Sequence, residues 1–183
     1  NVFPTFDFYV QQFETFAKMI PADGSYIYCA DDSVLSEMSN KIEHPNKKGY
    51  SMLPHTIVNG TTILNTSEGD FPLQIFGKHN LANLNAAKLA CNAVGISDLQ
   101  FYNAITSFKG ASNRLELLYK DEQTAAYKDF AHSPSKLKAT ITAVREQYPD
   151  KKLVACMELH TFSSLTEEFL QQYAGCMDNA DIP

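Results

Sequence analysis

Two asparagines three residues apart, Asn80 and Asn83, are the side chains whose types and spacing most clearly suggest chemistry in this sequence. They follow a strand-like run and a turn at Gly77, and residues three apart share one face of the first turn of a helix. Each carboxamide offers a donor and an acceptor, the pairing that the edge of adenine requires. This pairing gives the hypothesis of a nucleotide-base site. The alternative is that Asn80 caps the helix and Asn83 is solvated.

The neighbouring Gly77-Lys78 step does not complete a phosphate-binding P-loop. That motif requires a glycine five residues before its Gly-Lys step and a Ser or Thr directly after it. Pro72 and His79 occupy those two positions here. We therefore expect this segment to contact a base rather than to cradle phosphates.

The other polar clusters favour structural roles. Asp31 and Asp32 precede Ser33 at an expected helix start, where acidic side chains cap a helix more often than they bind a metal. His44 and His55 lie in loops beside prolines, without a Cys or carboxylate at metal-ligand spacing. We predict no metal site in this chain.

Apolar periodicity defines the elements that must position the asparagine pair. The step Asn59-Gly60 between two β-rich runs is a strong hairpin signal, because both residues tolerate positive φ. The elements expected in the first half are a helix over 6–20, a strand over 25–30, a helix over 33–42, a hairpin of 56–58 with 61–64, a strand over 71–76, and helices over 81–93 and 97–108.

The second half predicts a further α/β unit. Residues 115–119 and 124–130 are expected to form a second hairpin or a pair of strands. Ser133 and Pro134 are the expected cap and first position of a helix that reaches Tyr148. The unbroken apolar run within 152–159 is typical of a strand buried on both faces of a parallel sheet. A last helix follows over about 164–177. This strand–helix order predicts the α/β class.

Composition limits the possible functions. The chain has 183 residues, 44% of them hydrophobic, which is enough for one globular domain or two small ones. A net charge of −6 argues against a nucleic-acid partner. The four cysteines lack CxxC spacing, and no apolar stretch approaches the roughly 20 residues of a membrane span. We expect a soluble cytoplasmic protein with no membrane partner.

Three segments occur in the order and local context that they have in the Mur ligases, a family of bacterial cell-wall ligases. Residues 76–90, FGKHNLANLNAAKLA, resemble the family's G-x-H-N-x-x-N-x-x-A-A segment. Residues 108–116, FKGASNRLE, resemble the opening of its third domain, and residues 128–145, KDFAHSPSKLKATITAVR, resemble its D-Y/F-A-H-x-P segment and helix. The match covers nearly the whole chain, so the resemblance is specific.

The resemblance implies two partial α/β domains. Residues 1–108 would be the end of a Mur-type central ATPase domain, and residues 109–183 the start of a Rossmann-like C-terminal domain. The family's P-loop, its magnesium-binding Glu and its modified Lys all lie upstream of the matching segments. ATP and Mg²⁺ are the implied cofactors, and we expect a fragment that is inactive by itself.

The chemistry implied by the resemblance is amide formation. Mur ligases use ATP to phosphorylate a carboxylate of a UDP-N-acetylmuramyl precursor, and an incoming amine attacks the acyl phosphate. The resemblance is greatest to members that add L-alanine to UDP-N-acetylmuramate in peptidoglycan synthesis, or L-Ala-gamma-D-Glu-meso-diaminopimelate in recycling. The sequence does not separate these two substrates.

Position within the motifs implies roles for individual residues. Asn80 and Asn83 would meet adenine, with His79 beside them in the ATP site. Arg114 would reach the nucleotide from the third domain, and Asp129 would contact the ribose or help to close the site. Arg114 and Asp129 are therefore the candidate catalytic residues. Many relatives have two successive arginines where this chain has Asn113-Arg114.

The candidate substrate-binding residues are His132, Glu158 and His160. His132 lies in the third motif, where many relatives have a second histidine at the position of Ser133. Glu158 and His160 come at the carboxyl end of the expected strand over 152–159, where ligands of open α/β sheets bind. The alternative is that both are ordinary polar loop residues.

Two other functions stay open at this point. The chain could be a non-catalytic nucleotide-binding module, or part of a folylpolyglutamate-synthetase-like ligase acting on a γ-carboxylate, since fold alone does not fix the substrate. A P-loop upstream would favour an enzyme. The nature of the N-terminal domain would separate UDP-muramyl from folate substrates.

Overall fold

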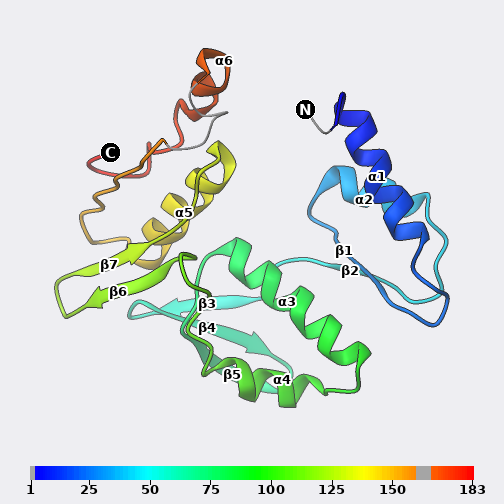
Figure 1. Cartoon of the computed structure of the whole chain (residues 1–183). Helices are drawn as coiled ribbons and strands as arrows, with labels where there is room; N and C mark the ends of the chain where they lie inside the picture. Colours follow the sequence, from blue (N-terminus) through cyan, green and yellow to red (C-terminus); the bar gives the residue numbers. More distant parts are fainter. Residues whose placement is uncertain (1–2, 160–165) are drawn as a thin grey trace. The chain divides into compact units, whose positions relative to one another are not determined.

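Figure 1 shows the computed structural model of the chain, which describes residues 3–159 and 166–183. The chain divides into two compact units. The first unit consists of Asn1–Leu53 with Ala82–Tyr102, and the second of Pro54–Leu81 with Asn103–Pro183. Helices and strands are mixed throughout, which confirms the predicted α/β class. The predicted domain boundary at 108/109 stays a prediction, because this division follows different residues. No helix among the described residues is long and apolar enough to cross a membrane.

The first unit contains a two-stranded parallel sheet packed with two helices. Its elements are α1 Phe6–Lys18, β1 Tyr26–Cys29, α2 Ser33–Asn40 and β2 Lys47–Tyr50. Strands β1 and β2 pair in parallel, and Ala17, Tyr26, Met38 and Ile42 form the buried core. The Tyr26 and Ser39 hydroxyls share a hydrogen bond of 2.6 Å, which fixes α2 against the sheet.

The acidic pair before α2 has a structural role. The Leu35 N–H donates to Asp32 Oδ1 at 2.9 Å, so Asp32 is the predicted helix cap. Asp31 Oδ2 accepts a bond of 3.3 Å from the Met52 N–H, just after β2. These contacts support the structural interpretation of both carboxylates.

The second unit begins with a three-stranded antiparallel sheet in the order β3-β4-β5. Its strands are β3 His55–Val58, β4 Thr61–Thr66 and β5 Gly69–Leu73. Asn59 and Gly60 connect β3 to β4 with φ of 50° and 69°. Both values are left-handed, as a two-residue turn of type I′ requires. The predicted hairpin is confirmed.

The rest of the second unit carries a second hairpin and a long helix, and both confirm predictions. Helices α3 and α4 each run across the division between the units. Ser133 has the extended backbone of a cap but makes no side-chain cap hydrogen bond. The bounds are α3 Lys78–Ala93, α4 Asp98–Ile105, β6 Glu116–Lys120, β7 Ala125–Lys128, α5 Pro134–Gln147, α6 Glu167–Leu170 and a 3₁₀ turn Gln171–Tyr173.

Helix α5 is joined to the three-stranded sheet by a buried glutamine. Gln147 is 4% exposed. The Thr62 hydroxyl donates to its Oε1 at 3.0 Å, and its Nε2 donates to the Gly60 carbonyl at 2.8 Å. Because the partners lie in the β3–β4 hairpin, this one side chain fixes the end of α5 against residues far earlier in the sequence.

An aromatic cluster lies beside this glutamine. The Tyr127 and Tyr148 hydroxyls share a hydrogen bond of 2.6 Å, and the Phe76 ring meets Tyr127 edge-on at 5.2 Å between centroids. Burial, followed by the hydrogen bond that its hydroxyl shares with Tyr148, raises the pKa of Tyr127. Phe76, Leu115 and Ala143 form the buried core beneath these rings. The segment between β5 and α3, the hairpin β6–β7 and α5 therefore share one core.

The predicted strand over 152–159 is wrong for the described part of the chain. A single parallel bridge, from Val154 to Ile182, pairs this segment. Leu153, Ala155 and Met157 pack toward α5, whereas Val154 is 63% exposed. A buried parallel strand needs backbone hydrogen bonds to neighbouring strands along its edges and packed residues on both of its faces. Here one face is covered, so the apolar run is extended but forms no strand.

Replacing Gln147 by Met should lower the free energy of unfolding by about 1–3 kcal/mol, because the buried Thr62 hydroxyl and Gly60 carbonyl lose their partner. Methionine is similar in length but forms neither bond. Chemical denaturation followed by circular dichroism measures the change. Gln123→Met, at an exposed turn position, is the matched control. Equal loss of stability in both variants would contradict the bridging role of Gln147.

Candidate functional site

The candidate site is built around the turn that leads into α3. Gly77 has φ of 90°, in the left-handed region that favours glycine. A Cβ at Gly77 would lie 2.7 Å from the Ala143 Cβ, closer than non-bonded carbons approach. The Asn80 side chain closes the turn from within, because its Nδ2 donates to the Phe76 carbonyl at 2.9 Å. The turn is therefore tightly fixed just where the predicted nucleotide motif begins.

Asn80 and Asn83 both lie on α3, as predicted. Asn80 is half-buried and Asn83 is exposed. The Asn80 amide donates to a carbonyl and does not accept from a helix N–H, so the capping alternative is wrong for this residue. The two residues fall on either side of the division between the units, within one continuous helix. Their contact with adenine stays a prediction.

Arg114 is presented by a loop with an unusual backbone. Its neighbours Asn113 and Leu115 have φ of 55° and 47°, values that non-glycine residues adopt rarely. The Leu115 N–H donates to Asp129 Oδ2 at 2.7 Å, and the Phe130 N–H donates to the Asn113 carbonyl at 2.9 Å. These bonds stabilise the loop from the β7 side. The Arg114 side chain is exposed, with no carboxylate within ion-pair distance among the described residues.

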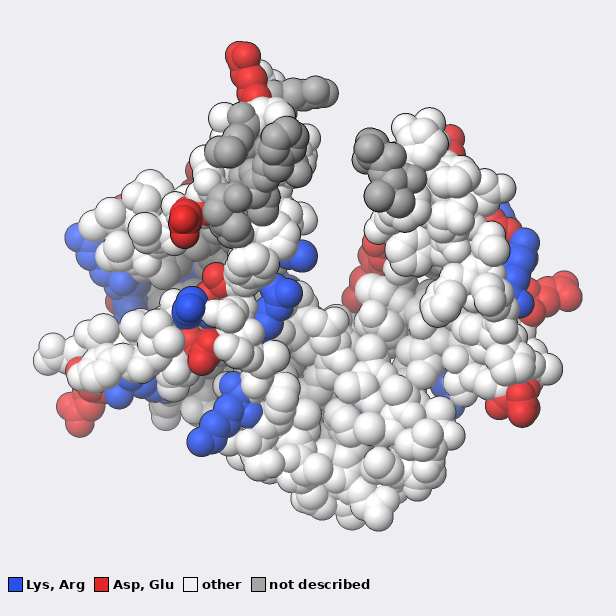
Figure 2. Space-filling model, in the orientation of Figure 1, with Lys and Arg blue, Asp and Glu red and all other residues white. Residues whose placement is uncertain are grey.

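His79 interacts electrostatically with both Arg114 and Asp129. Burial lowers the pKa of His79, the Arg114 charge lowers it further, and the Asp129 carboxylate opposes these effects. Arg114 and Asp129, predicted from two other motifs, therefore both lie near enough to His79 to affect its pKa within the second unit. Figure 2 shows Lys and Arg side chains, interspersed with carboxylates, over the part of this unit that carries β6, β7 and α5.

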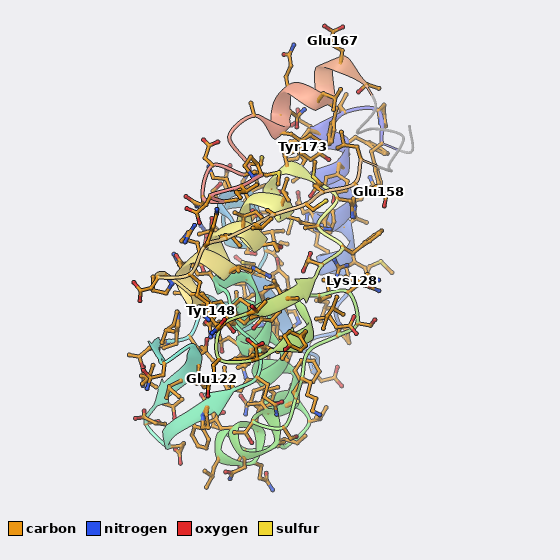
Figure 3. All side chains as sticks on the ribbon, turned by 90° about the vertical axis from the view of Figure 1, so that its left-hand side faces the viewer. Glu122, Lys128, Tyr148, Glu158, Glu167 and Tyr173 are labelled. Atoms are coloured by element: carbon orange, nitrogen blue, oxygen red, sulfur yellow. The ribbon has the colours of Figure 1, made fainter. Side chains whose placement is uncertain are left out.

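A groove of ≈ 760 Å³ lies between β7, α5 and the segment that follows α5, within the second unit. Asp129, His132 and Glu158 line it, so the structure brings two of the predicted substrate residues beside a predicted nucleotide residue. In Figure 3, Lys128 of β7 and Glu158 are labelled on the same side of this unit. Glu158 is exposed although the expected strand before it does not form. His160 lies outside the described residues.

His132 is held by its backbone and by its ring. Its Nδ1 lies 3.0 Å from the Phe130 carbonyl, which requires a proton on that nitrogen. The Tyr173 hydroxyl donates to the His132 carbonyl at 2.5 Å and ties this loop to the C-terminal segment. The ring therefore lies in a defined orientation at the wall of the groove.

Two supports of the turn at Gly77 escaped the sequence analysis. Lys78 Nζ and Glu146 Oε1 form an ion pair of 2.7 Å, and Ala143 packs directly on Gly77. Neither contact has a sequence signal, because an alanine and a glutamate on a helix are ordinary residues until the partner is known.

The described residues, 3–159 and 166–183, contain no group of three or more His, Cys, Asp or Glu side chains that could hold a metal ion. The polar groups near Gly77 are carboxamides, an imidazole and a guanidinium, which suit a base and phosphate oxygens. Magnesium ligands upstream of this chain stay a prediction.

Comparison with known proteins gave consistent relatives, although no family model matches the chain. Over 182 residues the chain is 28% identical to a UDP-N-acetylmuramate–L-alanine ligase from Arthrobacter sp. (strain FB24), covering 93% of this chain and 39% of that protein. Further bacterial relatives of 28% to 33% identity have the same name. The chain thus spans about two fifths or less of the curated relatives it matches.

Solved structures show the same fold. A UDP-N-acetylmuramate–alanine ligase from Thermotoga maritima superposes with a TM-score of 0.70 at 18% identity, covering 97% of this chain and 40% of that one. An FPGS–AMPPCP–folate complex gives a TM-score of 0.63 at 10% identity, with coverage of 94% and 45%. Identities this low establish the fold alone.

The burial of His79 predicts a pH dependence of stability. Because its pKa is lowered below the ordinary value of 6.5, the unfolded state binds the proton more tightly. The stability that neutral His79 contributes is present above pH 6.5 and is lost as the pH falls toward the lowered pKa. The unfolding free energy of wild type relative to His79→Gln should therefore fall between about pH 7.5 and about pH 5.5. Parallel pH profiles of the two proteins would contradict this.

Proposed function

We propose that this chain is part of an ATP-dependent ligase of the Mur family that acts on UDP-N-acetylmuramate, because its named relatives are UDP-N-acetylmuramate–L-alanine ligases. The amine added would be L-alanine, for which the matched relatives are named, or L-Ala-gamma-D-Glu-meso-diaminopimelate. ATP would activate the muramyl carboxylate as an acyl phosphate. Attack by the amine would then release orthophosphate and leave the amide, in peptidoglycan synthesis or recycling.

The observation that supports this proposal most is the electrostatic interaction of His79 with Arg114 and with Asp129. The three residues come from three motifs spread over much of the sequence, and the two charged side chains both affect the pKa of His79. A nucleotide needs polar contacts to its base, its ribose and its phosphates at once. The Asn80 carboxamide, the exposed Arg114 guanidinium and the Asp129 carboxylate are groups that can make these three kinds of contact.

Each side chain has a role in the proposed site. Asn80, Asn83 and His79 would recognise adenine from the start of α3. Arg114 would meet phosphoryl charge as a fixed cation, the kind of group that stabilises charge developing in a transition state. Asp129 uses Oδ2 to hold the Leu115 N–H, and its other oxygen would accept from a ribose hydroxyl.

The groove beside β7 is the proposed site of the acceptor amine. His132 and Glu158 line it, and a carboxylate there would attract an ammonium group before the amine is deprotonated. His160 is part of the same proposal, although it lies outside the described residues. These residues would distinguish a single amino acid from a tripeptide.

The domain division belongs to the proposal as well. Residues 1–108 and 109–183 would be the end of the central ATPase domain and the start of the C-terminal domain. The segment 107–111 would be the hinge, because Gly110 has φ of 93° and accepts backbone changes easily. The four free cysteines are compatible with the proposed cytoplasmic location.

A folate-type ligase is the second candidate, because the chain has the fold of an FPGS–AMPPCP–folate complex and fold alone does not fix the substrate. The named relatives of higher identity favour the muramyl substrate. Orthophosphate release separates the two in the intact enzyme. Release that depends on UDP-N-acetylmuramate and L-alanine supports the first candidate, release that depends on folate and glutamate supports the second, and no release supports a binding module.

Asn83→Ala should weaken binding of adenosine nucleotides by about 1–2 kcal/mol, the range for a lost hydrogen bond that strands its partner. The side chain is exposed, so folding should be nearly unaffected. Isothermal calorimetry with ATP on the intact enzyme measures the change, and Asn92→Ala on the later part of α3 is the control. Unchanged ATP affinity would leave Asn83 a solvated residue.

Arg114→Ala should lower turnover of the intact enzyme by roughly 10²-fold, as the loss of a cation at a transition state does. The exposure of Arg114 predicts little change in stability. Steady-state orthophosphate release measures turnover, and Lys109→Ala, a cation in the neighbouring loop, is the control. Full activity in Arg114→Ala would show that the guanidinium does not act on the phosphates.

A further inference from the structure

The turn that precedes α3 rests on a helix from the far end of the sequence. Ala143 of α5 is 3% exposed and occupies the space where a Cβ of Gly77 would otherwise lie. Phe76, the residue before the turn, shares a buried core with Ala143. The backbone of the turn is therefore in direct van der Waals contact with α5 and cannot move toward it.

A second contact holds the residue after Gly77. Lys78 is the first residue of α3, and its Nζ lies 2.7 Å from Glu146 Oε1 of α5. The two side chains are 62% and 36% exposed. Exposed pairs contribute little to global stability. The effect of this ion pair is therefore local, on the direction in which α3 leaves the turn.

A third contact fixes α5 along its own axis. Gln147 binds the Thr62 hydroxyl and the Gly60 carbonyl, so the last turn of α5 cannot slide over the sheet. Ala143, Glu146 and Gln147 are spaced by three and four residues, so they share one face of the helix. All three are directed at residues 60–78 of the same unit.

We infer that this face of α5, formed by Ala143, Glu146 and Gln147, positions His79 and Asn80 for the adenine base. None of the three is assigned a contact with the nucleotide, so they act through Gly77 and Lys78 as positioning residues. The inference rests on the proposed function, because the ligand of His79 and Asn80 is the proposed adenine. Ala143 lies in the helix of the third recognised segment, whereas Glu146 and Gln147 lie just beyond it, and the resemblance assigned none of the three a role at the base site.

The physical reason for such a support is the steep geometry of hydrogen bonds. The energy falls quickly when the donor–acceptor distance or angle departs from its optimum. One amide hydrogen of Asn80 is donated to the Phe76 carbonyl, so the orientation of the carboxamide depends on the backbone of residues 76–77. A small displacement of Gly77 therefore moves both the carboxamide and the imidazole away from a bound base.

Reversal of one charge tests the ion pair. In Glu146→Lys, two ammonium groups repel each other at the start of α3. Adenosine is the probe, because a neutral nucleoside is insensitive to the added charge. Affinity of the 183-residue chain, measured by NMR titration, should fall about three- to tenfold, the equivalent of one hydrogen bond. The imidazole resonances of His79 should shift in the absence of any ligand.

Exchanging the two charges is the decisive experiment. The double variant Lys78→Glu with Glu146→Lys has the charge of the wild type and a possible ion pair, so adenosine affinity and the His79 resonances should return toward wild-type values. Glu37→Lys breaks an exposed pair with Lys41 in the first unit and is the matched control. It should change neither readout.

Ala143→Val tests the packing contact independently. Two added methyl groups would press on Gly77 and should lower adenosine affinity and shift His79, while circular dichroism confirms the fold. Wild-type adenosine affinity and wild-type His79 resonances in both Glu146→Lys and Ala143→Val would overturn the inference. If the wild-type chain binds no adenosine, the proposed base site fails. Even then, a shift of the His79 resonances in Glu146→Lys that the double variant reverses would support positioning of His79 by α5.

Discussion

The arrangement near Gly77 depends on the absence of a side chain at that residue. A Cβ there would overlap Ala143, and the backbone has a left-handed φ of 90° that other residues adopt at a cost. The close approach lets the segment 74–77 turn into α3 while α5 packs against the turn. The proposed base-binding residues His79 and Asn80 follow within the first turn of α3, so their placement results from this one contact.

The loop that carries Arg114 shows a second constraint of the same kind. Asn113 and Leu115 are both left-handed without being glycine, which costs of order 1–3 kcal/mol each unless the surroundings enforce it. Asp129 supplies part of that enforcement through the Leu115 N–H. The carboxylate of Asp129, the residue just after β7, thus helps to determine where the Arg114 guanidinium can lie. The electrostatic link of both to His79 makes the three motifs one physical arrangement.

The sequence predicted local features well, and it failed where the outcome depends on distant partners. The Asn59-Gly60 hairpin and the helix α5 follow from backbone preferences that need no tertiary information. Strand β2 was not predicted, since Lys47-Lys48-Gly49 has no apolar alternation and the strand exists through its parallel pairing with β1. The apolar run over 152–159 was predicted as a strand and is not one, because its edges have a single bridge.

The candidate site divides in the same way. Motif positions predicted His79, Arg114 and Asp129 as site residues, and in the structure the charges of Arg114 and Asp129 both affect the pKa of His79. The supports Ala143 and Glu146 could not be predicted, because their partners are far away in sequence and their residue types are common on helices. The hydrogen bond from the Leu115 N–H to Asp129 could not be predicted either, because nothing in the sequence indicates that this leucine has a left-handed backbone.

The hydrogen-bonded pair Tyr127 and Tyr148 has a spectroscopic consequence. The chain has no tryptophan, so its near-ultraviolet absorption comes mainly from its nine tyrosines. Tyr127 ionises at a higher pH than an exposed tyrosine, because it is buried and bonded to Tyr148 at the end of α5. If α5 left the sheet, that hydroxyl would meet water and ionise with the exposed tyrosines. The tyrosinate absorbance of the unlabelled protein, followed against pH in the alkaline range, therefore reports whether α5 is packed against the sheet.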